Sequence, residues 1–127
     1  MRAADVKVGS LYQVRVGSEL ACVRVIGTRH EMLYRHEIER GKKPRTLFVC
    51  VRAELPSGSM PLPKARPAAS LTPFRVDLFE TRLRGLWRLR GDLTHGRWAL
   101  GELDRLRPLA LALGVSVESA IAAQVQS

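Results

Sequence analysis

Two copies of an Arg-His-Glu triplet, at residues 29–31 and 35–37, come closest to a catalytic or metal-binding motif in this sequence. A helical zinc site of the His-Glu-x-x-His type needs a second histidine four residues after the first. The corresponding positions here are Tyr34 and Arg40, so neither copy meets that requirement. We therefore predict polar loop residues at these positions.

Other signatures of metal binding or catalysis are incomplete. The remaining candidate zinc ligands are Cys22, His30, His36 and Cys50. Their spacing is unlike that of known structural zinc sites. The stretch Gly41–Thr46 has lysines and a threonine but lacks the second glycine of a phosphate-binding loop. No serine lies in a nucleophile elbow, and neither cysteine has an evident general base. We expect a protein that is not an enzyme and that uses no metal and no cofactor.

The charge of the chain points to an acidic partner. The net charge is +9, and residues 1–76 carry fourteen basic against six acidic residues, whereas residues 77–127 carry seven against six. Such a surplus attracts phosphate backbones or anionic surfaces. Seventeen of the basic residues are arginines, which bind phosphate or carboxylate with two hydrogen bonds. A GC-rich genome would also favour arginine codons.

Composition predicts a folded cytoplasmic protein. With 127 residues, of which 46% are hydrophobic, the chain can bury one core or two small ones. Its first residues lack the apolar segment of a secretory signal, and the uncharged stretch 108–117 is too short to span a membrane. The two cysteines are expected to be free thiols in a reducing compartment.

Apolar residues of the first half alternate in short runs, as in β-strands. The expected strands are 11–16, 20–28, 45–55 and 71–76, with an edge strand or an extended connector at 60–67 and a 3₁₀ turn at 68–70. Residues 29–44 fit either a long hairpin tip or one helical turn. The phrases Val8–Tyr12, Cys22–Ile26 and Arg66–Leu71 resemble those of small SH3-like barrels of bacterial and phage type. This resemblance implies a small antiparallel barrel over residues 1–76.

The second half has helical periodicity. Its two apolar stripes consist of Phe79, Leu83, Leu86, Trp87 and Arg90, and of Ala99, Leu103, Leu106, Ala110 and Leu113. Residues 94–96 interrupt the pattern, and Pro108 predicts a kink or a break within the second stripe. Ser116 suits the start of a final helix that ends near Val125. The expected fold class is therefore α+β, with a bundle of two to three short helices at 77–127 packed on or beside the barrel.

Residues 109–121 resemble the helix-turn-helix core of bacterial and phage repressors. Gly114 would permit the turn, and Ser116 would cap the second helix. Residues 108–127 contain no lysine or arginine, whereas a helix in the major groove normally brings basic residues with it. We favour a packing corner here over a DNA-reading helix.

Alternation along the strands predicts a basic outer face. The side chains expected to point outward are Gln13, Arg15, Cys22, Arg24, Phe48, Cys50 and Arg52. Those expected to point inward are Tyr12, Val14, Val16, Ala21, Val23, Val25, Leu47, Val49 and Val51. Arginines beside an aromatic ring are typical of single-strand binders, although alternating arginines also simply keep an outer face solvated.

Two functions compete. The first is a small nucleic-acid-binding protein that contacts mainly the phosphate backbone with low sequence specificity, on DNA or RNA. Its candidate binding residues are Arg15, Arg24, Arg52, Lys42, Lys43, Arg45, Arg82, Arg84, Arg88 and Arg90. The alternative is an adaptor, such as a phage-type inhibitor or assembly factor, that docks on an acidic protein through Trp87 or Trp98.

Overall fold

The chain divides into a sheet unit, Met1–Phe74, and a helical unit, Arg75–Ser127. Its computed structural model describes residues 1–56 and 58–115. The division lies two residues before the boundary that the sequence predicts at residue 76. The predicted α+β class, with an antiparallel barrel-like sheet followed by helices, is confirmed.

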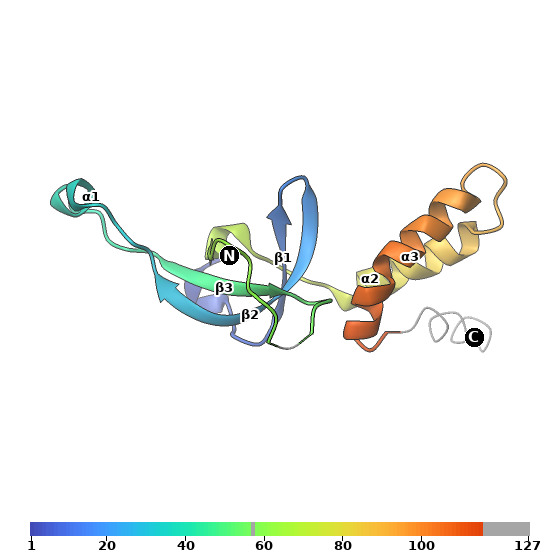
Figure 1. Ribbon diagram of the computed structural model, residues 1–127, viewed down its shortest axis with the longest axis horizontal. Coiled ribbons are helices and arrows are strands. Elements are labelled where there is room, and N and C mark those ends of the chain that lie inside the picture. The colour runs from blue at the N-terminus through green and yellow to red at the C-terminus, as the bar shows by residue number, and fades with distance from the viewer. Residues whose placement is uncertain (57, 116–127) are drawn as a thin grey trace. The chain divides into compact units, whose positions relative to one another are not determined.

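The sheet unit is a curled half-barrel of five antiparallel strands in the order β4-β3-β2-β1-β5 (Figure 1). The strands are β1 (Leu11–Val16), β2 (Glu19–His30), β3 (Thr46–Arg52), β4 (Arg66–Pro67) and β5 (Thr72–Pro73). Two 3₁₀ turns, η1 (Ala3–Asp5) and η2 (Ala68–Ser70), complete the unit. β5 follows η2 and returns to pair with β1. The predicted first strand and 3₁₀ turn are confirmed, and β5 is shorter than predicted.

The β2–β3 hairpin extends beyond the other strands of the sheet. Its strands stay paired as far as His30 and Thr46, and the short helix α1 (Arg35–Glu39) lies at its end. Figure 1 shows this end projecting beyond the rest of the sheet unit. Both structures that the sequence left open for residues 29–44 are therefore present, a long hairpin and a helical turn at its tip.

One side of the sheet forms the core of the sheet unit. The core cluster comprises Val6, Tyr12, Val14, Ala21, Val23, Val25, Phe48, Cys50, Ala68 and Leu71. Phe48 and Cys50 are 2% and 0% exposed, so their predicted outward orientation is wrong. Phe48 and Cys50 alternate with Leu47, Val49 and Val51, so both faces of β3 carry apolar residues and the wholly apolar set is not the inward one. Pairing decides it, because Cys50 lies opposite the buried Val25.

Cys22 has the predicted outward orientation, but it is buried all the same. It lies opposite Gln13, on the face of the sheet away from Val23 and the core cluster. The chain continues past β3 along this part of β2, where the amide of Ala53 donates to the carbonyl of Cys22 at 3.0 Å.

The helical unit is a hairpin of α2 (Val76–Leu89) and α3 (Gly96–Ala112). Its buried residues are Phe79, Leu83 and Leu86 in α2, and Gly96, Ala99, Leu103, Leu106 and Ala110 in α3. They include most of the two predicted apolar stripes, although Trp87 and Leu113 are only half-buried and Arg90 is exposed. The interruption predicted at residues 94–96 is present, between the end of α2 at Leu89 and the start of α3 at Gly96. Of the two outcomes expected at Pro108, the break is wrong, because α3 runs unbroken through it. Pro108 removes one backbone hydrogen bond from the helix. Burial of Leu106 and Ala110, on either side of Pro108, offsets that loss and keeps the helix continuous.

A glycine in the left-handed conformation ends α3, as predicted. Gly114 has a φ of 70°, and its amide donates to the carbonyl of Leu111 at 3.1 Å. The amide of Val115 donates to the carbonyl of Ala110 at 2.9 Å, which completes a Schellman motif. The predicted turn glycine is confirmed. The predicted final helix, including Ser116, lies outside the described residues.

Among residues 1–56 and 58–115, no helix combines the length and the apolar character that crossing a bilayer requires.

Candidate nucleic-acid interface

The sheet unit exposes far more positive than negative charge. Residues 1–74 contain thirteen basic and six acidic residues. Eleven of the basic side chains are exposed, whereas only three of the acidic ones are. The other three carboxylates, those of Glu31, Glu37 and Glu54, are half-buried in contacts with basic side chains. The surface of this unit is therefore more basic than its composition alone indicates.

The end of the β2–β3 hairpin, residues 29–45, holds the densest group of these charges, and we call it the hairpin tip. It contains six basic and three acidic residues. Glu31 anchors its base, since the carboxylate accepts a hydrogen bond from Nε of Arg45 at 2.8 Å and lies 3.7 Å from Nζ of Lys42. The hydrogen bond from Arg45 holds the pKa of Glu31 below its usual value. Arg45 and Lys42 thus point toward a carboxylate of their own hairpin.

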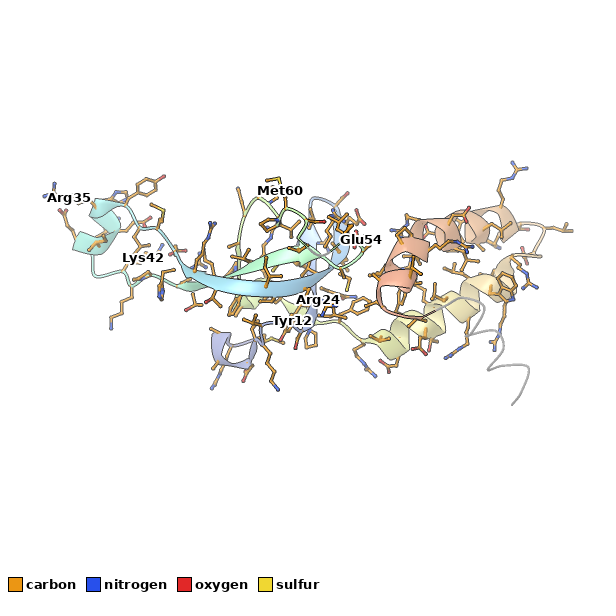
Figure 2. All side chains as sticks on the ribbon, turned by 60° about the horizontal axis from the view of Figure 1, so that its bottom comes forward. Tyr12, Arg24, Arg35, Lys42, Glu54 and Met60 are labelled. Atoms are coloured by element: carbon orange, nitrogen blue, oxygen red, sulfur yellow. The ribbon has the colours of Figure 1, made fainter. Side chains whose placement is uncertain are left out.

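Backbone and carboxylate contacts fix the shape of the tip. The amide of Tyr34 donates to Oε2 of Glu37 at 3.3 Å, and the amide of Lys42 donates to the carbonyl of Glu37 at 3.1 Å. Arg35 forms an exposed ion pair with Glu39 at 3.2 Å. Arg35 and Lys42, both labelled in Figure 2, lie at this end of the hairpin, remote from the core residue Tyr12. The tip is therefore a defined structural element.

Three basic residues of the tip are left over after these contacts. Arg29, Arg40 and Lys43 are exposed and make no side-chain hydrogen bond or ion pair with any residue in the described ranges. The sequence predicts only Lys43 of these three as a binding residue. The dense charge of residues 29–45 was the available signal for Arg29 and Arg40.

The tip also exposes an aromatic pair. The rings of Tyr34 and His36 are stacked, with centroids 5.7 Å apart and planes 8° from parallel. Tyr34 is 72% exposed, and the neighbouring Met32 is 94% exposed. Sequence analysis assigned the stacking aromatic to Phe48, which is in the core. Tyr34 lies between the two Arg-His-Glu triplets, and an aromatic residue within this basic segment was the available signal.

Two of the three strand arginines share the outer face of the sheet. Arg24 lies opposite Leu11 and Arg15 opposite Leu20, both on the face away from the core. Arg15 is exposed, and Nη1 of Arg24 donates to the carbonyl of Gly9 at 2.8 Å.

Arg52 does not belong to this outer face. It lies opposite Val23, on the core side, and pairs with Glu54 at 3.4 Å and Glu19 at 4.0 Å. The predicted outer face that combines three arginines with Phe48 is therefore wrong. The reason is the inverted orientation of β3, which carries both Phe48 and Arg52.

The arginine run of α2, which consists of Arg82, Arg84 and Arg88 in the helix and Arg90 directly after it, is largely engaged within the helical unit. Arg82 forms an ion pair with Glu102 of α3 at 2.9 Å, and Nη2 of Arg84 lies 3.2 Å from Oγ1 of Thr81. Arg90 donates to the carbonyl of Trp87 at 2.6 Å, and its guanidinium lies 3.8 Å from the centroid of the Trp87 ring. Arg88 alone is exposed with no such contact to a described residue.

Glu102 is the carboxylate that organises the helical unit. It accepts hydrogen bonds from Arg105, at 3.2 and 2.9 Å, and from Arg82 at 2.9 Å. These contacts hold the pKa of Glu102 below its usual value, and the hydrogen bond from Arg105 has the largest effect. Three of the four predicted binding arginines of α2 are thus already in contact with neighbouring groups.

The thiols are free, as predicted, and both are buried. Burial, with a smaller contribution from Glu54, raises the pKa of Cys22 to about 12. Burial also raises the pKa of Cys50. A buried, protonated thiol is a poor nucleophile and a poor metal ligand. Within residues 1–56 and 58–115, no three His, Cys, Asp or Glu side chains are grouped so that they could hold a metal ion.

Compared with models of known protein families, with curated proteins and with solved structures, the chain has no significant match. The function is therefore inferred from the residues of this chain and their geometry.

Proposed function

We propose that this protein is a small, non-enzymatic nucleic-acid-binding protein that contacts mainly the phosphate backbone with low sequence specificity. The observation that carries the proposal is the exposure of eleven basic against three acidic side chains on the sheet unit. Each phosphate neutralised by such a side chain releases condensed counterions, which favours binding without regard to sequence. The two buried free thiols suit a reducing compartment such as the cytoplasm.

The sheet unit is further proposed to be an SH3-like barrel. Support comes from the strand order β4-β3-β2-β1-β5 and from the 3₁₀ turn η2 that precedes β5. Such a shape hosts many functions, so it adds little to the functional proposal by itself. The charge of its surface carries the assignment.

The second candidate is an adaptor that docks on an acidic protein. The observation that favours it is Trp98, which lies 57% exposed on α3. Exposed tryptophans often anchor protein interfaces, and the basic sheet unit would steer an acidic partner toward this chain. Trp87, the other predicted anchor, is half-buried and covered by Arg90.

The test is direct binding of purified protein to labelled 20-base single strands and duplexes of unrelated sequence, measured over a series of salt concentrations. We expect similar affinities for unrelated sequences and a linear fall of log affinity with log salt. A polyglutamate peptide of equal length serves as a polyanion control. No binding of any nucleic acid at low salt, or tighter binding of polyglutamate, would overturn the proposal and leave the adaptor function.

A further inference from the structure

We propose that the hairpin tip binds unpaired bases of single-stranded nucleic acid. In this proposal a base stacks on the exposed ring of Tyr34, and Arg29, Arg40 and Lys43 contact the flanking phosphates. It rests on the proposed nucleic-acid-binding function and specifies both the element that binds and the form of the ligand.

The ring pair supplies a platform for stacking. Tyr34 is 72% exposed, and its ring lies nearly parallel to that of His36. The backbone of Tyr34 is tied to the short helix through two hydrogen bonds with Glu37, one to its carboxylate and one from its amide. A ring that is already oriented loses less freedom when a base stacks on it. Every base offers an aromatic face, so such contacts tolerate any sequence.

The free cations of the tip supply the phosphate contacts. Arg29, Arg40 and Lys43 make no side-chain hydrogen bond or ion pair within the described ranges, so a phosphate can approach them without breaking an existing pair. Lys42 and Arg45 lie on the same hairpin, where Glu31 balances part of their charge. Aromatic rings flanked by cations that follow a backbone are typical of single-strand binding sites.

The geometry favours an unpaired strand over a duplex. Bases inside a duplex are stacked on both faces, so an external ring cannot reach them unless they are extruded. The tip projects from its sheet unit (Figure 1), and it exposes the Tyr34 ring as well as the side chains of Met32 and Ile38. A base of a single strand can contact such a surface, because it can turn out of the strand and leave its own faces free.

The experiment compares a labelled 20-base single strand, an abasic strand of the same length and the corresponding duplex, using wild type, Tyr34→Leu and Tyr34→Phe. The Leu variant keeps bulk but removes the ring, and the Phe variant keeps the ring. We expect Tyr34→Leu to weaken binding of the base-containing strand about tenfold. We also expect Tyr34→Phe to bind the base-containing strand as tightly as wild type does. Wild type and both variants should bind the abasic strand with the same affinity.

The salt dependence separates stacking from charge. Tyr34→Leu should leave the slope of log affinity against log salt unchanged, because it removes no phosphate contact. Lys43→Ala should reduce that slope by about 0.7, the contribution of one phosphate contact on a single strand. Ultraviolet crosslinking of wild type to the same strand should label a peptide that contains Tyr34, which tests the site without any substitution.

Several results would overturn the inference while the proposed function stands. These are equal affinity of wild type for base-containing and abasic strands, full affinity of Tyr34→Leu, tighter binding of the duplex, or crosslinks confined to the helical unit. If polyglutamate binds more tightly than any strand and Tyr34→Leu weakens it, the tip is a protein-docking site. Failure of wild type to bind any nucleic acid at low salt removes the proposed function and this inference together.

Discussion

The hairpin tip and the arginine run of α2 are both rich in cations, yet the structure uses those cations differently. In α2, Arg82, Arg84 and Arg90 are held by groups of the helical unit, and Arg88 is left over. In the tip, three cations pair with three carboxylates, and three more remain without a partner in the described ranges. A dense group of basic residues in the sequence therefore does not show how many of them are free to bind a ligand.

The difference follows from where the acceptors lie. Glu102 is on α3 and reaches Arg82 because the two helices are antiparallel neighbours, so the ion pair supports the helical hairpin. In the tip, Glu31 at the base pairs with Arg45, Glu37 in α1 lies near Lys42, and Glu39 pairs with Arg35. The remaining cations are exposed. We infer that the run in α2 serves mainly stability and that the tip serves mainly binding.

The largest expected effect comes from removing the free cations of the tip. The triple change Arg29→Ala, Arg40→Ala and Lys43→Ala should reduce the slope of log affinity against log salt by about 2, since each single-strand phosphate contact adds about 0.7. Affinity at low salt should fall for all sequences alike. The measurement is fluorescence anisotropy over a salt series.

Neutralising Arg82, Arg84, Arg88 and Arg90 together is the matched comparison. We expect a smaller loss of slope, because three of these side chains must leave existing partners before they reach a phosphate. A larger loss of slope from this quadruple change than from the tip variant would reverse the comparison between the two regions.

The next largest effect concerns the joint between α2 and α3. A Cβ on Gly96 would lie 2.5 Å from the carbonyl oxygen of Arg90, closer than such atoms approach. Gly96→Ala should therefore destabilise the helical unit by about 1–3 kcal/mol. Gly101→Ala is the control in the same helix, because nothing lies within 4 Å of its Cβ and alanine favours helix by about 0.5–1 kcal/mol. Urea unfolding measures both, and equal effects would show that Arg90 does not crowd Gly96.

The two organising carboxylates allow a paired test of charge and pH. Glu31→Gln releases Lys42 and Arg45 for phosphate binding, so affinity and salt slope should rise. Glu102→Gln releases Arg82 and Arg105 in the helical unit, so we expect a change in stability with little change in salt slope. A rise in slope from Glu102→Gln equal to that from Glu31→Gln would contradict the assignment of binding to the tip.

The same two variants test the sign of the pH dependence. The pKa values of Glu31 and Glu102 are both lowered in the folded protein, so their contacts stabilise it above the unfolded value near 4.5. That contribution is lost as pH falls through the lower folded pKa. Wild type should therefore lose more stability than either variant between pH 7 and pH 3, as measured by urea unfolding.

The smallest expected effect is on the thiols, which report whether the sheet core stays intact. Cys22 and Cys50 are buried and protonated, so a thiol reagent should react slowly with native wild type and with the triple tip variant alike. Two reactive thiols should appear after denaturation. Rapid reaction in the tip variant alone would mean that its binding loss reflects a damaged sheet.

Burial of Cys22 also predicts that the folded protein loses stability at alkaline pH. Its pKa rises from 9.0 to about 12 on folding, so the unfolded thiol ionises first as pH increases. Stability from this residue is complete below pH 9 and is lost as pH rises toward 12. Cys22→Ala should therefore show a shallower loss of stability over this range.

Local pattern in the sequence determined the elements of this protein. Strand β1, the 3₁₀ turn at 68–70, the interruption at 94–96 and the turn glycine Gly114 each depend on residues that are neighbours in the chain. Turn residues and apolar period act over a few positions, so they can be read without knowing the fold. The split into a basic β half and a helical half is predicted for the same reason.

Only the tertiary structure decided which side chains are buried and which charges are free. β3 has apolar residues on both faces, so its pairing with Val25 rather than its own pattern placed Phe48 and Cys50 in the core. Likewise, Arg82 is engaged because Glu102, twenty residues away, lies on the adjacent helix. Orientation and pairing depend on partners that are distant in sequence. The sequence lists the charged residues, and the tertiary structure determines which of them can bind a ligand.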